Sequence, residues 1–125
     1  MTRRFSRSVL SLLNASRILR IRSGADHRFL GIWVVVVGGR VFVRPWFDKP
    51  GGWRRAFLEE PRGAILVGDA KREILVRARP ARGERLFDAI DAAYARKYVT
   101  GASQKWVRGF ATPRRRRTTM ELRPR

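Results

Sequence analysis

The sequence predicts a single α+β domain built mainly of antiparallel β-strands, and three patterns support this fold class. Two runs rich in β-branched and aromatic residues, 29–37 and 40–46, flank a Gly-Gly pair that can adopt the positive φ angles of a tight hairpin turn. Apolar and polar side chains alternate over residues 72–79, which indicates a strand with one solvated face. The apolar side chains of residues 84–98 fall on one stripe, as in an amphipathic helix.

Length and composition limit the classes of protein to consider. A chain of 125 residues suffices for one hydrophobic core, so we expect residues 1–125 to form one domain. The longest apolar run, residues 32–37, is far shorter than the ~20 residues of a membrane-spanning helix, and we expect a cytoplasmic protein. Without cysteine the chain has no disulfides, thiol catalysis or thiolate metal sites, and a single histidine predicts no metal site.

The amino-terminal part is predicted to form a helix and a strand before the hairpin begins. Apolar residues spaced by three or four positions predict a modest amphipathic helix over residues 5–16. Residues 18–22 alternate between apolar and basic side chains, which indicates a short strand.

The second hairpin strand has two different faces. Its two-residue period places Val41 and Val43 on the core side. The opposite side, which we expect to form a site or an interface, carries Phe42, Arg44 and Trp46.

After the hairpin, the pattern predicts a helix, two strands and a second helix. The first helix covers residues 53–60 and is ended by Pro61. A strand apolar on both faces follows at 64–67, and the alternating strand of 72–79 leads into the amphipathic helix of 84–98.

The carboxyl-terminal part is expected to close the fold with one more strand. Residues 100–112 predict a loop or short helix that carries Trp106 and Phe110. Residues 113–117 are interpreted as a solvated basic loop, and residues 118–123 as a closing strand.

Arginine dominates the charge, and much of it lies near the termini. The net charge is +19, and only four of the 29 basic residues are lysines. Residues 1–23 hold six arginines and no acid, including a basic arm at 1–8, and the loop of 113–117 adds four consecutive arginines. This distribution favours nonspecific nucleic-acid binding, although a GC-rich genome alone would also enrich arginine.

The candidate binding residues gather where the hairpin ends and the short helix starts. A helix start carries unpaired N–H groups and a partial positive charge, which suits a phosphorylated ligand. The guanidinium groups of Arg44, Arg54 and Arg55 offer planar sets of N–H donors that can hold a phosphate. Trp46 and Trp53 can stack on a flat ring, although aromatic side chains of this size more often fill a core or a dimer interface.

On the predicted helix of residues 84–98, Lys97 and the pair of Asp88 and Asp91 can have either a functional or a purely structural role. Lys97 lies on the apolar stripe, where its stem can pack while its amine reaches solvent or a ligand. Asp88 and Asp91 have the spacing of an acid–base pair, but Arg85 lies three residues before Asp88 and favours a helix-surface ion pair. No residue is therefore assigned a catalytic role.

The order of these elements resembles the split β-barrel of flavin-dependent pyridoxamine-phosphate oxidases and deazaflavin-dependent nitroreductases. Over nearly its whole length the chain is similar to domain-of-unknown-function family 2255. The segments that carry the resemblance are IWVVVV at 32–37, FVR at 42–44, WRR at 53–55, AIDAAY at 89–94 with KY at 97–98, and the stretch from TT at 118–119 to 125.

The resemblance implies a barrel of about six antiparallel strands with peripheral helices that forms a homodimer. It also implies a phosphorylated cofactor, FMN or a deazaflavin coenzyme, in a groove between the subunits. In the flavin enzymes the phosphate is held at the end of a barrel strand and the start of the next helix, which here fall on Arg44, Trp53, Arg54 and Arg55. A barrel of this kind can also keep its fold without any cofactor.

Three functional hypotheses follow from the sequence. The first is an oxidoreductase-like protein that binds a flavin or deazaflavin nucleotide through Arg44, Trp46, Trp53, Arg54, Arg55 and Lys97. The second is a cofactor-free basic protein that binds nucleic acid weakly and without sequence specificity. The third is a structural dimer with neither ligand.

Overall fold

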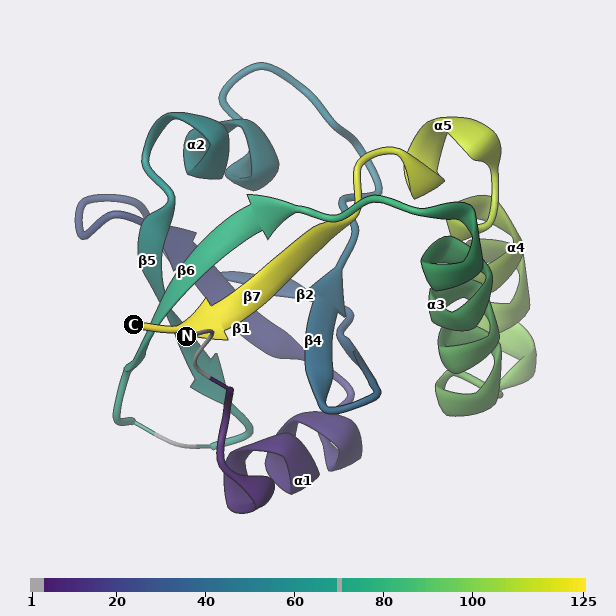
Figure 1. Ribbon diagram of the computed structural model, residues 1–125, viewed down its shortest axis with the longest axis horizontal. Coiled ribbons are helices and arrows are strands. Elements are labelled where there is room, and N and C mark those ends of the chain that lie inside the picture. The colour runs from purple at the N-terminus through teal and green to yellow at the C-terminus, as the bar shows by residue number, and fades with distance from the viewer. Residues whose placement is uncertain (1–3, 70) are drawn as a thin grey trace.

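One antiparallel sheet organises the chain, with strand order β2-β1-β5-β6-β7-β4-β3 (Figure 1). This is a computed structural model, and it describes residues 4–69 and 71–125. The strands are β1 Leu19–Ser23, β2 Leu30–Ile32, β3 Val35–Val37, β4 Arg40–Val43, β5 Arg62–Val67, β6 Ile74–Pro80 and β7 Met120–Pro124. The predicted class, a mainly antiparallel α+β fold, is confirmed.

The two edge strands of the sheet, β2 and β3, are neighbours in the sequence. Only Trp33 and Val34 separate them, so the sheet curls into a half-barrel whose opposite edges share one bent segment. The predicted strand of residues 29–37 is therefore divided at this bend, and counting its halves as one strand gives the six predicted strands.

Side chains from the end of α3 hold the bend. The Val34 N–H donates to the Tyr98 hydroxyl at 3.1 Å, and the Val34 carbonyl accepts from the Lys97 amine at 2.8 Å. These side chains supply hydrogen bonds that a ladder would otherwise give to Val34, so the apolar run of residues 32–37 can bend between β2 and β3.

The helices lie around the sheet without entering it. They are α1 Arg7–Ala15, α2 Trp53–Glu59, α3 Glu84–Lys97, the 3-10 turn η1 Gly101–Ser103, α4 Gln104–Phe110 and α5 Pro113–Arg116. Figure 1 shows α3 and α4 side by side beyond β4, with α1 and α2 at opposite ends of the barrel. In the described part of the chain, no helix has the length and apolar character that a membrane crossing requires.

The buried side chains form two cores, one on each side of β4. Val41 and Val43 face the barrel interior, as predicted, together with Met120 and Leu122 of β7. Phe42 points the other way, into a second core between β3, β4, α3 and α4. The predicted site face is therefore largely covered by helices, and only its margin is open.

The hairpin turn agrees with its sequence signature. Gly38 and Gly39 have φ angles of 58° and 75°, values that suit a tight turn and that glycine adopts without strain. The turn fixes the register in which Val35 pairs with Phe42, and so decides which β4 side chains face α3.

Candidate functional site

An aromatic hollow of about 300 Å³ opens at the margin of the second core. Its walls come from β2, the bend, the end of the hairpin and α4. The lining residues are Ile18, Gly31, Ile32, Trp33, Arg44, Trp46, Trp106 and Phe110. A concave, mainly aromatic site with one cationic group has the size and composition of a small-molecule binding site.

The rings of the aromatic hollow support one another. Trp46 meets Trp106 and Phe110 edge to face, with ring centroids 4.5 and 5.5 Å apart. Trp106 and Phe110 are four residues apart on α4, so one helix face presents both rings. Trp33 stacks on Tyr98 with centroids 3.8 Å apart, which fixes the opposite wall.

Trp46 is enclosed from two sides. Its ring lies against the backbone of Gly109, where a Cβ would come within 2.2 Å of the indole. The Arg115 guanidinium lies 3.7 Å from the ring centroid, and its Nε donates to the Trp46 carbonyl at 2.9 Å. The indole is therefore held in one orientation before any ligand arrives.

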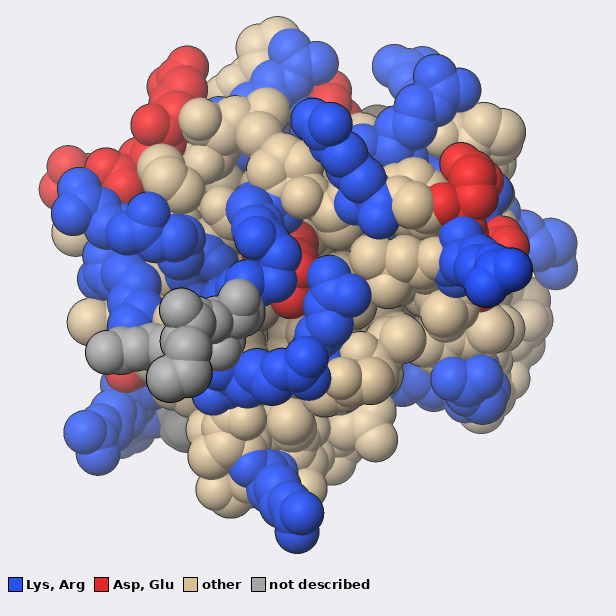
Figure 2. Space-filling view, in the orientation of Figure 1, with Lys and Arg blue, Asp and Glu red and all other residues tan. Residues whose placement is uncertain are grey.

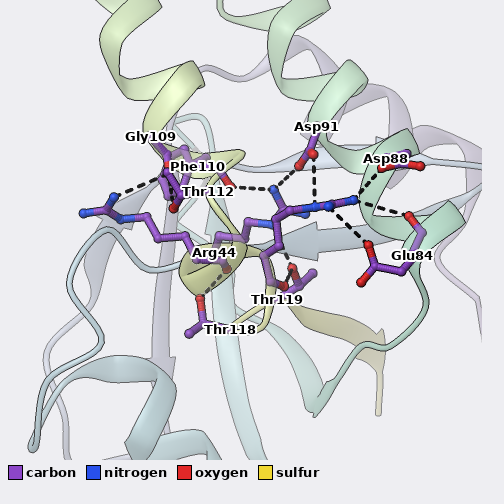
Figure 3. Close-up of polar contacts among 11 residues, drawn as sticks. Arg44, Glu84, Asp88, Asp91, Gly109, Phe110, Thr112, Thr118 and Thr119 are labelled. Carbon is purple, nitrogen blue, oxygen red and sulfur yellow. Dashed lines mark hydrogen bonds and ion pairs between the residues drawn. The ribbon is translucent and has the colours of Figure 1, made fainter.

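Among the residues that the structure describes, Arg44 is the one charged residue in the wall of the aromatic hollow, and it is 1% exposed. Its Nε donates to Thr119 Oγ1 at 2.7 Å, and its Nη1 donates to Asp91 Oδ1 at 2.5 Å and to the Phe110 carbonyl at 2.9 Å (Figure 3). Its buried Nη2 has no hydrogen-bond partner in the part of the chain that the structure describes. A buried unpaired donor is costly unless a ligand accepts from it.

The acidic face of α3 binds the basic run rather than leaving it in solvent. Arg116 forms ion pairs with Glu84 at 3.2 Å, Asp88 at 2.5 Å and Asp91 at 3.2 Å. Figure 3 shows these three carboxylates along α3. The prediction of a solvated loop at 113–117 is therefore wrong in part, because residues 113–116 form α5, three carboxylates bind Arg116 and the Trp46 ring binds Arg115. Arg114 and Arg117 are exposed, as predicted. The partner of Asp88 is Arg116 and not the predicted Arg85.

Arg54 and Arg55 lie together, apart from Arg44. Arg54 Nη1 donates to Asp48 Oδ2 at 3.0 Å, and Arg55 Nη2 donates to the Asp48 carbonyl at 3.2 Å. Trp53 packs against the barrel core, with its ring edge-on to Phe57. The structure thus separates the predicted phosphate arginines into two groups, and neither Arg54 nor Arg55 lines the aromatic hollow.

Lys97 joins three elements at the bend. Its amine donates to the carbonyls of Leu13 and Val34, both at 2.8 Å, and its side chain lines a separate hollow of about 350 Å³. Burial lowers the pKa of Lys97 to about 8 and raises the pKa of the neighbouring Tyr98 to about 12. Lys97 therefore holds α1 to the bend, away from the aromatic hollow.

A basic hollow of about 410 Å³ adjoins the aromatic one, and Trp46 belongs to both walls. Its lining residues are Pro45, Trp46, Phe47, Asp48, Lys49, Arg114, Arg115 and Thr118. Three cations and one acid give it an excess of positive charge. The two hollows together offer an aromatic compartment beside a cationic one.

Sequence reasoning identified Arg44 and Trp46 but missed Trp33, Trp106 and Arg114 as wall residues. Trp106 and Phe110 have helical i, i+4 spacing, which could have indicated one shared face. No local signal connects Trp33 with α4, since only the folding of α3 against the bend brings them together.

Three solved structures have the same fold at low sequence identity, and they show the fold alone. A conserved hypothetical protein of Mycobacterium tuberculosis aligns with a TM-score of 0.59 and 15% identity, over 98% of this chain and 81% of that chain. A putative pyridoxamine 5'-phosphate oxidase of Listeria innocua gives a TM-score of 0.56, 11% identity, and coverage of 94% and 90%. The FAD and heme binding protein of Mycobacterium smegmatis gives 0.55, 17%, and coverage of 98% and 67%.

These likenesses identify the half-barrel as a split barrel, as the sequence resemblance implied. No curated protein sequence matches the chain. The profile of one family, described as uncharacterized protein conserved in bacteria (DUF2255), matches residues 13–122. That match covers the structure from α1 to β7, so the chain belongs to the DUF2255 family.

Proposed function

We propose that the protein binds a flavin or deazaflavin nucleotide in the two adjoining hollows and serves as a redox protein. The observation that carries the proposal is the aromatic hollow lined by buried Arg44, a residue whose Nη2 has no hydrogen-bond partner among the described residues. The M. smegmatis protein of similar fold is described as binding FAD, which supports the same choice of ligand.

The residues fit a flat ring with polar edges. Trp33, Trp46 and Trp106 provide apolar faces and edges, and an aromatic ligand gains stacking energy from such walls. A ring carbonyl near Arg44 would accept from its Nη2 and relieve the buried unpaired donor. The hollow volume of about 300 Å³ lies at the lower end of the range for ligand sites.

The basic hollow fits the phosphate of such a nucleotide. Arg114 and Lys49 line the basic hollow, which shares Trp46 with the aromatic hollow, and we assign them to the phosphate of a ligand whose ring occupies the aromatic hollow. Arg115 contributes its positive charge while its Nε stays bonded to Trp46. This assignment replaces the predicted phosphate role of Arg54 and Arg55 in our proposal, because both are bonded to Asp48.

The cofactor supplies the hydride chemistry, and the chain supplies binding and orientation. Arg44 forms an ion pair with Asp91, and an N–H of its guanidinium that has no partner in the described chain would polarise a ligand carbonyl. The three tryptophans exclude water from one side of the ligand. No side chain of this site is required to act as a nucleophile.

The proposal is tested by titrating the purified protein with FMN, FAD, riboflavin and a deazaflavin coenzyme while following tryptophan fluorescence. Trp106→Ala removes an exposed wall of the aromatic hollow, so we expect at least a tenfold loss of affinity for the bound cofactor, about 1.4 kcal/mol. Trp53→Phe, at the fourth tryptophan, is the matched control and should leave affinity unchanged.

A second variant separates the ring compartment from the phosphate compartment. Arg114→Gln should weaken FMN and leave riboflavin unaffected, because riboflavin lacks the phosphate. The absence of binding to any of the four ligands would refute the proposal, as would equal losses in Trp106→Ala and Trp53→Phe.

A further inference from the structure

One side of the sheet carries a cluster of cations that the proposed cofactor site does not use, and we call it the arginine face. It consists of solvent-facing residues of β4, β5, β6 and β7. Its members are Arg40, Arg62, Arg77, Arg79 and Arg123, with Glu60 and Glu121 as the carboxylates bonded to them. Figure 2 shows Lys and Arg gathered over β6 and β7, with a small acidic area enclosed among them.

The strand register places three arginines in one row. Arg62 of β5 is the Cα partner of Arg77 on β6, and Arg77 is in turn the partner of Arg123 on β7. Neighbouring strands lie ~4.8 Å apart, so the row spans about 10 Å. Like charges directly opposite one another on adjacent strands destabilise a sheet, so this row has a cost in stability.

Glu121 is saturated by its neighbours. Arg40 donates to it at 2.9 and 3.1 Å, Arg123 at 3.2 and 3.3 Å, and Arg79 at 3.4 Å. Burial alone would raise the pKa of Glu121, but the hydrogen bonds and charges of Arg40 and Arg123 outweigh it and lower that pKa to about 2. One carboxylate thus serves three arginines and has no capacity for more.

The acids leave an excess of positive charge on the arginine face. Five guanidinium groups meet two carboxylates, and Glu60 is engaged by Arg62 at 3.1 Å. Within residues 4–69 and 71–125, the side chain of Arg77 makes no hydrogen bond or ion pair, and the residue is exposed. Arg79 and Arg62 are also more than half exposed, at 53% and 57% of their side chains.

We propose that the arginine face binds the phosphate backbone of nucleic acid without reading its sequence. Guanidinium forks match phosphate oxygens, and a strip of cations suits a polymer that carries phosphates at regular spacing. The exposed aromatic side chains of the described chain, Phe47 and Trp106, lie elsewhere, so the face has no platform on which bases could stack.

The arginine face is a different surface from the one at which the sequence predicts nucleic-acid binding. The sequence predicts nucleic-acid binding at the run of 113–117, but only two of its four arginines, Arg114 and Arg117, are exposed. Arg115 is held by Trp46 and Arg116 by three acids of α3. The arginines of this face come from four strands. The strand register brings them side by side, and this produces the excess of positive charge. It is independent of the cofactor hollows.

The test measures binding of a labelled random-sequence duplex, and of the same single strand, by fluorescence anisotropy at increasing NaCl concentration. Arg77→Gln with Arg79→Gln should reduce affinity at least tenfold at low salt and reduce the slope of log K against log salt by about 2. Arg77→Gln alone, at a side chain with no partner, should reduce the slope by about 1.

The matched control has the same change in net charge at a different place. Arg85→Gln with Arg108→Gln removes two exposed arginines from α3 and α4, and should change affinity less than twofold. Equal losses in the two double variants would overturn the proposal, because net charge alone would then explain binding. The proposal would also be overturned if the unmodified protein bound neither nucleic acid at low salt. A parallel titration with vesicles of acidic lipid would overturn it if the protein bound the vesicles and neither nucleic acid.

Thermal unfolding gives an independent readout. Because Arg77 lies between two like charges, Arg77→Gln should keep or raise the unfolding temperature while weakening nucleic-acid binding. If Arg77→Gln lowered the unfolding temperature and left nucleic-acid binding unchanged, the row of arginines would stabilise the fold rather than bind nucleic acid, and the proposal would fail.

Discussion

At the scale of the residue, buried charged side chains bind several neighbouring groups. Arg44 and Glu121 are both almost fully buried, and each is surrounded by groups of opposite charge or by hydrogen-bond partners. Removing one partner from a buried ion pair leaves the other charge without compensation, which costs more than the pair contributes. One substitution at either residue is therefore expected to have a large electrostatic effect on stability.

Glu121→Gln is expected to destabilise the fold by about 3 kcal/mol at neutral pH, because three arginines lose their shared carboxylate. The folded-state pKa of Glu121 is about 2, below the ordinary 4.5, so the unfolded chain binds a proton first as pH falls. The stabilisation is thus complete above pH 4.5 and is lost as pH falls toward 2.

Urea unfolding of both proteins across this pH window checks the prediction, and the two stabilities should converge near its acidic end. Glu73→Gln is the control, since Glu73 pairs with Arg22 at the surface and its loss should cost less than about 1 kcal/mol. Similar losses for Glu121→Gln and Glu73→Gln at neutral pH would contradict the buried-carboxylate argument.

Some site residues were predictable singly, and their grouping was not. Arg44 and Trp46 stand out because strand alternation places them opposite two core valines. The partners of Arg44, namely Asp91, Phe110 and Thr119, lie 47 to 75 residues further along the chain. No local pattern encodes contacts at such separations, so the orphaned Nη2 could not be foreseen.

At the scale of the element, the position of α4 decides the shape of the aromatic hollow. Gly109 of this helix lets the backbone contact the Trp46 ring. A Cβ built at Gly109 would lie only 2.2 and 2.5 Å from two carbon atoms of that ring. Any side chain there must displace either the indole or the helix. A glycine that normally weakens a helix therefore has a packing reason in this one.

Gly109→Ala is expected to lower stability by about 1–3 kcal/mol, although alanine is the better helix former. It should also move Trp46, so cofactor affinity should fall with stability. Gly101→Ala is the control, because no atom lies within 4 Å of a Cβ built there. Thermal unfolding of both variants checks the pair, and an unaffected Gly109→Ala protein would show that α4 does not press on Trp46.

The elements themselves followed the sequence closely, apart from three. The second hairpin strand, predicted over residues 40–46, ends at Val43, just before the residues that precede and follow Pro45. The strand of residues 29–37 is divided because Lys97 and Tyr98 bind Val34, and both reach it through tertiary packing of α3. The basic loop at 113–117 contains the helix α5 because Arg116 meets the acids of α3. In the last two places, distant side chains override the local pattern.

At the scale of the whole molecule, the predicted homodimer stays a prediction, with support from exposed apolar side chains. Ile18 and Trp106, at the rim of the aromatic hollow, are 44% and 37% exposed, and Leu30 of the edge strand β2 is 47% exposed. Association of two copies over this rim would bury these side chains and enclose a bound ring.

Light scattering should therefore give a mass twice the 14.5 kDa of one chain. Ile18→Glu should shift the protein to a single-chain mass by placing a charge in the interface. Leu58→Glu is the control, because Leu58 is similarly exposed at 48% but lies on α2. A single-chain mass for the unmodified protein would contradict the predicted homodimer.

The sequence by itself determined the mainly antiparallel α+β class, the hairpin, the main helices and the large positive charge, because these depend on local periodicity and composition. Only the tertiary structure decided that the sheet edges meet at a bend, that Arg44 is buried in an aromatic wall, and that three arginines share a row. Those features arise from contacts between residues far apart in the chain, where burial and strand register select partners that no local pattern specifies.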